Sequence, residues 1–331
     1  MVRVFLTHPP ETLAKYYGQR ALAALAEMVE VRTNPHHRVL DAQELTEQIR
    51  GCAIVISDRQ TPGYAELFAH SPDLAAWLRC AVDIRNIDVE AASSAGILVA
   101  HATPGFGTAV AELALGLMID LGRNISSSVV AYRSGGTPPA PMGRQLQGST
   151  LGIIGYGEIG IRLAAFGHAL GMIVLVADPY KTVEAPGVRQ VAMGELLAQS
   201  DFVVCLAVAT PETVNLMGRD AFFQMRNDAF FVNLSRGELV DEAALAAALD
   251  AGEIAGAAMD VGRAPDQMPN PDLASRQDVV ATPHLAGLTP AAIEHQAFDT
   301  VEQVRALLSG TMPAQAVNRD RVTRLARLAT T

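Results

Sequence analysis

Two short motifs carry side chains that could bind a small acid and exchange a proton with it. The motif NLSRG at 233–237 contains Arg236, whose planar guanidinium can bind a carboxylate bidentately and polarise a neighbouring carbonyl oxygen. The motif TPH at 282–284 contains His284, and an imidazole can give a proton to a ketone oxygen and take it back. A lone arginine or histidine is more often structural. Because each motif follows an apolar run typical of a strand, the two predict one acid–base site.

A glycine-rich turn at 151–160, LGIIGYGEIG, predicts a binding site for a dinucleotide pyrophosphate. Gly155 permits the tight turn, Gly157 lets the backbone approach the phosphates, and Gly160 lets the next helix lie against the strand. The remaining turn residues are expected to contact the cofactor too; they are Tyr156, Glu158 and Ile159. A glycine turn is weak by itself, but here it lies between a strand-like run and a helical pattern.

The following strand, MIVLVAD, ends in Asp178, 18 residues beyond Gly160. An acidic residue at about this distance binds the ribose hydroxyls of a dinucleotide and repels a 2′-phosphate. NAD is therefore the expected cofactor. NADP remains the alternative because Lys181 lies close to Asp178 in the sequence.

Strand-like runs alternate with helical patterns along the chain, which predicts an α/β fold with doubly wound parallel sheets. Ligands should then bind beyond the carboxyl ends of the strands, where Ala207 and Val208 suit an adenine pocket. The expected strands are 2–7, 52–57, 77–84, 97–101, 151–154, 172–178, 202–208, 229–234, 254–259 and 278–282. The expected helices are 11–28, one from 108, 192–199, 219–225, 241–251 and 290–309.

The length of 331 residues suggests two domains. The first strands and helices lack a phosphate-binding glycine loop, so they should form the substrate side. The final helix should return to them. We therefore expect a discontinuous substrate-binding domain at 1–101 plus 286–331 and a Rossmann domain at 102–285, with a cleft between them. The apolar helix from 108 should be buried between domains or subunits.

Composition argues against several classes of protein. The formal charge of −10 disfavours nucleic acid or an anionic membrane as the main partner. The cysteines at 52, 80 and 205 lie in apolar runs and suit reduced core thiols, so neither a disulfide framework nor a metal site is expected. No uncharged apolar run approaches the roughly 18 residues of a membrane span. A cytoplasmic protein is predicted, and the four arginines at 319–327 are expected on a solvated helix face.

The chain resembles the D-isomer-specific 2-hydroxyacid dehydrogenase family from residue 86 to residue 289. The matching elements are NID, VAELALGLM, GIIGYGEIG, TPETVNLMG, VNLSRGELVDEAAL, AAMDV and TPHLAGLT. The resemblance implies that Arg236 binds the substrate carboxylate and carbonyl, that His284 is the acid/base, and that Asp260 lies beside the nicotinamide carboxamide. It also implies a homodimer through the helix at 108–124. Further cofactor contacts are expected at Thr108, Thr213, Leu234 and Ser235.

The chain departs from the family pattern beside the histidine. The family usually has a glutamate five residues after the Asp of AAMDV, hydrogen-bonded to the histidine, but this chain has Pro265 there. Asp266 is adjacent and is the tentative replacement. Asp83 and Glu294 remain alternatives.

A second departure lies in the substrate loop before NID. The family often has two glycines there, and this chain has Ala81 and Asp83. Backbone N–H groups near Val82 are the expected carboxylate contacts. Arg59 is a further candidate, although it could instead pair with Asp58 or Asp83. In the histidine loop Gly287 is retained, while Ala286 replaces the other glycine.

The sequence thus predicts an enzyme that interconverts a 2-oxoacid and a D-2-hydroxyacid with NAD. The alternative is a dinucleotide-sensing interaction protein that keeps this fold with little catalysis. Oxidation of NADH with small 2-oxoacids distinguishes the two hypotheses.

Overall fold

The computed structural model describes residues 1–328, apart from the side chain of Asp266. The chain forms two compact units: unit 1 contains Met1–Phe106 and the segment from Thr289 on, and unit 2 is Gly107–Leu288. The sequence-based boundaries lie at 101/102 and 285/286, a few residues from these divisions. That each unit is a separate domain stays a prediction.

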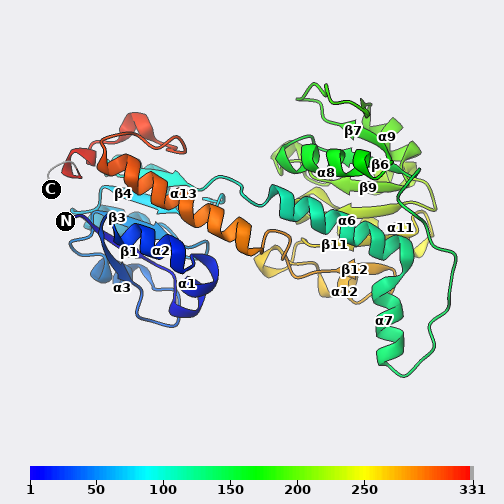
Figure 1. Ribbon diagram of the computed structural model, residues 1–331, viewed down its shortest axis with the longest axis horizontal. Helices are drawn as coiled ribbons and strands as arrows, with labels where there is room; N and C mark the ends of the chain where they lie inside the picture. Colours follow the sequence, from blue (N-terminus) through cyan, green and yellow to red (C-terminus); the bar gives the residue numbers. More distant parts are fainter. Residues whose placement is uncertain (329–331) are drawn as a thin grey trace. The chain divides into compact units, whose positions relative to one another are not determined.

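Unit 1 contains a five-stranded parallel sheet in the order β2-β1-β3-β4-β5 within the described residues. Figure 1 labels β1, β3 and β4 of this sheet. The strands are β1 (Arg3–Leu6), β2 (Glu30–Thr33), β3 (Ile54–Ser57), β4 (Ala76–Arg79) and β5 (Leu98–His101). The helices are α1 (Pro10–Tyr16), α2 (Gln19–Ala26), α3 (Ala42–Gln48), α4 (Ala65–His70), α5 (Val89–Ser94) and α13 (Pro290–Leu308).

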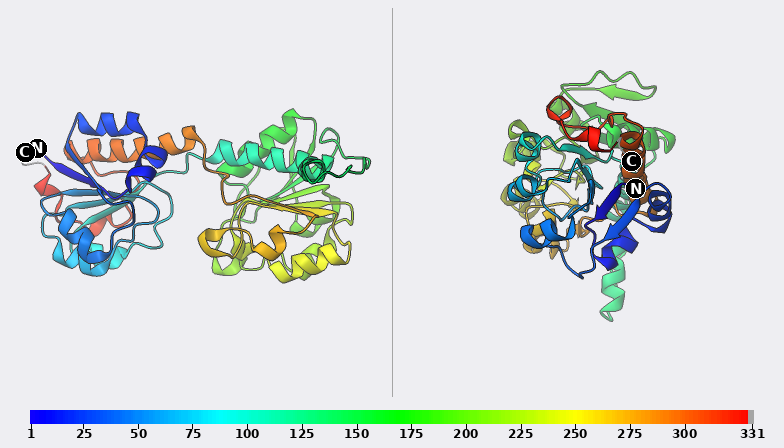
Figure 2. Two further views of the ribbon diagram at one scale, coloured as in Figure 1. Left: turned by 90° about the horizontal axis from the view of Figure 1, so that it is seen from below. Right: turned by 90° about the vertical axis from the view of Figure 1, so that its left-hand side faces the viewer.

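Both faces of this sheet are covered by helices, because alternate residues of each strand are apolar on both sides. Val4, Ile54 and Leu78 join a core with residues of α2 and α13. Phe5 and Trp77 join a second core with residues of α3, α4 and α5. Figure 2 shows the two layers, with α2 and α13 on one side of the sheet.

Unit 2 contains a seven-stranded parallel sheet in the order β12-β11-β10-β9-β6-β7-β8, again within the described residues. The strands are β6 (Thr150–Ile154), β7 (Ile173–Ala177), β8 (Val188–Gln190), β9 (Phe202–Cys205), β10 (Phe230–Asn233), β11 (Gly256–Met259) and β12 (Val279–Ala281). The order reverses between β6 and β9, which is where ligands bind in such sheets. The two parallel sheets confirm the predicted fold class.

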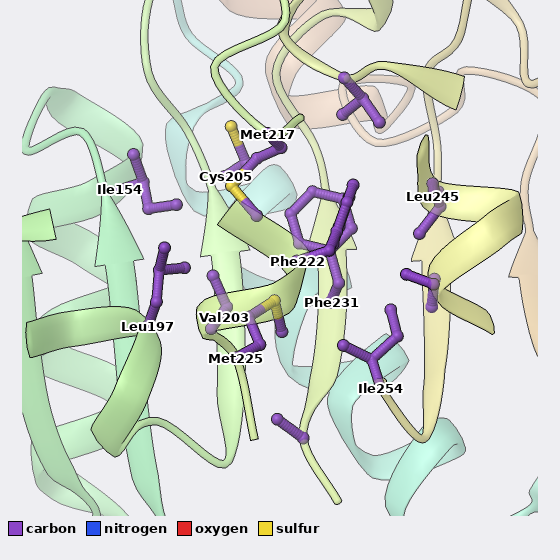
Figure 3. Close-up of a cluster of buried hydrophobic side chains, with 14 of the residues drawn as sticks. Ile154, Leu197, Val203, Cys205, Met217, Phe222, Met225, Phe231, Leu245 and Ile254 are labelled. Carbon is purple, nitrogen blue, oxygen red and sulfur yellow. The ribbon is translucent and has the colours of Figure 1, made fainter. Parts of the chain in front are cut away.

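Helices also cover both faces of the unit 2 sheet. They are α6 (Gly107–Arg123), α7 (Ile125–Arg133), α8 (Glu158–Ala169), α9 (Met193–Gln199), α10 (Arg219–Gln224), α11 (Glu242–Asp250) and α12 (Pro271–Ala274). One core joins strands β9, β10 and β11 to α9, α10 and α11, with Phe222 packed edge-on against Phe231 at its centre (Figure 3). The predicted burial of the three cysteines is confirmed: all are buried free thiols.

The arm formed by α7 and the loop at 134–148 differs from the rest of unit 2. None of the residues of α7 is buried, and the arm extends from the end of α6 (Figure 1). In the described part of the chain no single helix is long and apolar enough to cross a membrane. Among the described helices, only α6 and α7 taken together, with a bend of 65° between them, have the necessary length and apolar composition.

Three predicted elements were wrong in their extent. The helix at 11–28 is interrupted at Gly18, which has φ +82° and separates α1 from α2. The strands at 77–84 and 202–208 end at Arg79 and Cys205, and the apolar residues that follow are in loops. The tail arginines were also predicted wrongly as a helix face: they lie in or beside short 3-10 turns, Arg319–Arg321 and Leu325–Arg327.

Candidate active site

The glycine turn after β6 contains glycines that serve two different purposes. Gly155 has φ +96°, and a Cβ at Gly160 would lie 2.3 Å from the Gly155 carbonyl oxygen. The fold itself therefore requires both residues. A Cβ at Gly157 would meet nothing within 4 Å. Because packing within the chain does not demand a glycine there, the open space above Gly157 fits an approaching phosphate.

Helix α8 starts at this turn and presents its first N–H groups without a side-chain cap from the described residues. The N-terminus of a helix of this length attracts anions through those N–H groups and the helix dipole. Glu158 lies in its first turn and binds Arg162 at 3.2 Å. Ile159 is half-buried, while Tyr156 is buried.

Asp178 follows β7 and is held in one position by main-chain donors. The Tyr156 N–H donates to Oδ2 at 2.7 Å, and the Tyr180 N–H donates to Oδ1 at 2.8 Å. Gln190 of β8 fixes the same loop, because its amide donates to the carbonyls of Asp178 and Lys181 at 2.9 and 2.7 Å. Each carboxylate oxygen can accept more than one hydrogen bond, so two ribose hydroxyls can still bind. Nothing in the sequence pattern pointed to Gln190.

The loop after β9 continues the same sheet edge. Val208 is 76% exposed, which leaves its side chain accessible to a ligand. Thr213 Oγ1 donates to the Val208 carbonyl at 2.8 Å, and Ser235 Oγ donates to the Ala207 carbonyl. Leu234 is buried. Thr108 is exposed in the first turn of α6. The open glycine turn, uncapped helix and fixed carboxylate together fit an extended dinucleotide.

Arg236 follows β10 in an extended conformation, with φ −146°. Its backbone is held by the fully buried Asn233, whose amide donates to the Arg236 carbonyl at 3.0 Å. The guanidinium donates to the Ser235 carbonyl at 2.8 Å and is half-buried. Asn233 is part of the NLSRG motif, but its positioning role was missed from sequence.

His284 has a left-handed backbone, with φ +52°, and Asp260 stabilises the loop around it. The Asp260 carboxylate is 1% exposed. Its Oδ1 accepts from Thr282 Oγ1 at 2.7 Å and from the Leu285 N–H at 2.8 Å, and Oδ2 accepts from the Ala286 N–H at 3.0 Å. A non-glycine residue in this region costs about 1–3 kcal/mol unless its surroundings hold it. Asp260 supplies that support, a role that the sequence did not reveal.

Arg236, Asp260 and His284 lie at one end of three neighbouring strands. Asn233 of β10 is in register with Met259 of β11, which is in register with Ala281 of β12. Strands β10 and β12 are therefore about 10 Å apart, since neighbouring strands are separated by about 4.8 Å. A guanidinium and an imidazole on strand ends this close can contact one small molecule.

The carboxylates considered as partners of His284 have different surroundings. Pro265 begins the 3-10 turn Pro265–Gln267, and the side chain of Asp266 lies outside what the structure describes. Glu294 in unit 1 binds Arg20 at 2.7 Å. Asp83, also in unit 1, binds Arg85 at 2.8 Å. The tentative role of Asp266 therefore stays a prediction.

The carboxyl edge of the unit 1 sheet contains an open pocket of about 300 Å³. It is lined by Arg59, Asp83, Arg85 and Asn86. The Asp58 carboxylate, one expected partner of Arg59, accepts instead from Thr7 Oγ1 and the Thr61 N–H, both at 3.0 Å. Val82 is half-buried beside this pocket in the chain, and Gly287 is half-buried in the histidine loop of unit 2.

These features define a two-unit α/β protein in which unit 2 has a sheet of the dinucleotide-binding type. Residues 115–286, more than half of the chain, match the NAD-binding domain of the D-isomer-specific 2-hydroxyacid dehydrogenases. The chain belongs to this family.

Curated relatives and solved structures agree with this placement. The chain is 33% identical over 325 residues to D-3-phosphoglycerate dehydrogenase of Methanocaldococcus jannaschii, covering 96% of this chain and 60% of that protein. It thus spans about three fifths of the relative's length. It also resembles the solved structures of TT0316 from Thermus thermophilus (TM-score 0.82, 30% identity) and Escherichia coli D-lactate dehydrogenase (TM-score 0.82, 25% identity). Each comparison covers 96% of this chain and 100% of the solved one.

Proposed function

We propose that the protein is an NAD-dependent enzyme that interconverts a 2-oxoacid and a D-2-hydroxyacid. The main support is the arrangement of Arg236, Asp260 and His284 at the ends of β10, β11 and β12. The family match over 115–286 adds an independent line of support.

Arg236 is proposed to bind the substrate through its carboxylate and its C2 oxygen. A guanidinium suits both oxygens because it offers a planar fork of donors with a permanent charge. In unit 1, Arg59, Val82 and Asp83 are proposed as further substrate contacts, since their loops adjoin or line the pocket of about 300 Å³. Gly287 is proposed as a contact from the histidine loop.

His284 is proposed to exchange the proton on the C2 oxygen. Bound NADH would supply the hydride. The protein's own contribution is to orient the imidazole, which the three hydrogen bonds from the histidine loop to Asp260 support. Asp266 is retained as a tentative partner of His284, in place of the glutamate that the family usually has.

NAD is proposed over NADP because of the fixed carboxylate of Asp178. A 2′-phosphate would meet that negative charge, and the two main-chain donors oppose any movement of the side chain away from it. We also propose adenine contacts at Ala207 and Val208, and cofactor contacts at Thr108, Thr213, Leu234 and Ser235.

A homodimer formed through the helix at 108–124 and the arm is also proposed. Exposed apolar side chains are concentrated there: Ile119, Ile125, Val129, Val130, Tyr132 and Met142. Apolar side chains gathered this way mark a protein interface more often than a free surface. Sedimentation velocity of Val130→Asp tests the proposal, with Phe223→Asp, at an exposed position outside the arm, as the control. Only the arm variant should sediment as a monomer; a monomeric wild type would exclude this dimer.

The activity is tested by NADH oxidation with glyoxylate, hydroxypyruvate, pyruvate and phenylpyruvate. Arg236→Ala and His284→Ala should each lose at least 100-fold in kcat/KM. Exposed Arg219→Ala and His168→Ala serve as controls in the same unit. NADH binding without turnover of any substrate would favour the dinucleotide-sensing alternative. A rate that is unchanged in both active-site variants would overturn the assigned roles.

A further inference from the structure

Arg79, the last residue of β4, is a fully buried arginine that is not part of the chemistry proposed above. Among the described residues, no carboxylate lies within salt-bridge distance of its guanidinium. Its hydrogen-bond acceptors are neutral oxygens: the carbonyls of Asp58 and Thr61 (3.0 Å for Thr61) and Asn86 Oδ1 at 2.6 Å. Burial lowers the pKa of Arg79 to about 10, so the group is still charged at neutral pH.

These acceptors belong to the two loops that form the unit 1 pocket. Asp58 and Thr61 flank Arg59 in the loop after β3, and Asn86 is in the loop after β4. Asn86 extends the network, because its amide donates to the Arg59 carbonyl at 3.2 Å. Two main-chain hydrogen bonds join the same loops, from the Gly63 N–H to the Asn86 carbonyl at 3.0 Å and from the Asp88 N–H to the Gly63 carbonyl at 2.9 Å.

Fold stability alone gives no reason for a charge at this position. A buried ion is costly to desolvate, and well-packed apolar side chains are often as good or better for stability. Apolar side chains cannot hold three oxygens from two loops, because this requires several hydrogen-bond donors in a fixed plane. An arginine provides these, whereas a lysine provides a single point charge.

We propose that Arg79 is a positioning residue for substrate binding, because it sets the separation of the loops that carry Arg59 and residues 82–86. It acts through those loops and does not touch the substrate. This proposal rests on the proposed function, in which the same loops contact the acid.

The kinetic test compares Arg79→Lys with Trp77→Phe. Trp77 is also fully buried on β4, two residues earlier, and packs against Phe68 with ring centroids 5.3 Å apart. Arg79→Lys should raise KM for the 2-oxoacid about tenfold, as expected for losing a charge-assisted hydrogen bond. KM for NADH should not change. Trp77→Phe should lower the melting temperature with both KM values unchanged. A 2-oxoacid KM that is equal in wild type and Arg79→Lys would overturn the proposal.

Hydrogen exchange provides a readout that does not need activity. In Arg79→Lys the amides of Gly63 and Asp88 should exchange about tenfold faster, while those of β1 should keep wild-type protection. Faster exchange throughout unit 1 would show a general loss of stability and would contradict the proposal. If the wild type reduced no 2-oxoacid and exchange in Arg79→Lys still rose only in the two loops, the role of Arg79 in holding these loops would stand. The proposed function would then fail.

Discussion

The carboxyl edges of the two sheets are built in opposite ways. In unit 2 the edge has an open glycine turn, a helix without a side-chain cap, and main-chain groups held by single buried anchors such as Asp260. In unit 1 the edge has polar groups that hydrogen-bond to one another around the buried Arg79 and Asp58, beside the open pocket of about 300 Å³.

The difference fits the ligands proposed for the two edges. An edge that receives a long, charged cofactor must leave donors unused and space unfilled. An edge that contacts a small acid can instead be rigid, because rigid loops hold a few donors at fixed positions. We therefore expect substitutions in unit 2 to affect the site most directly, and those in unit 1 to affect mainly stability and loop position.

The largest effect is expected from Asp260→Asn. The amide keeps the shape but turns one acceptor into a donor, so a loop N–H or the Thr282 hydroxyl loses its partner. Displacement of His284 should then lower kcat about 100-fold, as small misplacements of catalytic groups do. Steady-state kinetics checks this, with exposed Asp272→Asn as the control. Unchanged kcat would mean that the loop does not need this carboxylate.

Two glycines of the turn after β6 should differ in their roles, with Gly160 needed for stability and Gly157 for ligand binding. Gly160→Ala should destabilise unit 2 by about 3 kcal/mol or more, because its Cβ would lie 2.3 Å from a carbonyl oxygen. Gly157→Ala should leave the melting temperature unchanged and weaken NADH binding, because only a ligand would meet its Cβ. Urea unfolding and fluorescence titration with NADH measure the two effects. Equal NADH affinity in Gly157→Ala and wild type would contradict a phosphate site there.

Unit 1 should lose stability in mild acid because of His8, which is 1% exposed. Burial lowers the pKa of His8 to about 4; Arg79 also lowers it, and Asp58 opposes the shift. The folded state therefore keeps His8 neutral while the unfolded state, with a pKa of about 6.5, takes up a proton. The contribution of neutral His8 to the free energy of unfolding is therefore fully present above pH 6.5. It falls by about 3 kcal/mol as the pH drops to 4.

The His8→Phe variant tests this sign. Its free energy of unfolding should depend less on pH between 6.5 and 4 than that of the wild type, whereas exposed His36→Gln should follow the wild type. Urea unfolding at several pH values provides the measurement. A wild-type curve parallel to that of His8→Phe over this range would show that His8 does not couple folding to pH.

Periodicity predicted the parallel α/β fold, and the resemblance of short motifs predicted the family, because both signals are local in the sequence. The short helices α3, α4 and α5 were missed, since six or seven residues are too few to establish a helical repeat. The end of β4 at Arg79 was missed because the run WLRCAVDI is mainly apolar on both sides of the boundary.

The anchors of the site were less visible than the site itself. Asp260 and His284 are 24 positions apart, and nothing in this spacing indicates that the Asp260 carboxylate stabilises the loop that contains His284. Arg79 appears as one arginine in an apolar segment, and its acceptors become apparent only when two loops are brought together. The proposed site residues remain predictions until they are tested.

Helix α13 completes a core whose other elements lie at the start of the chain. Val301 and Val304 pack with Leu25 and Leu78, and Asn318 hydrogen-bonds to the Ile97 carbonyl at 2.9 Å. During translation, unit 2 is made in between, which takes roughly 10 to 40 s at typical rates. Until α13 is synthesised, the part of this apolar face that α13 covers in the finished protein has only α2 and its neighbours beside it.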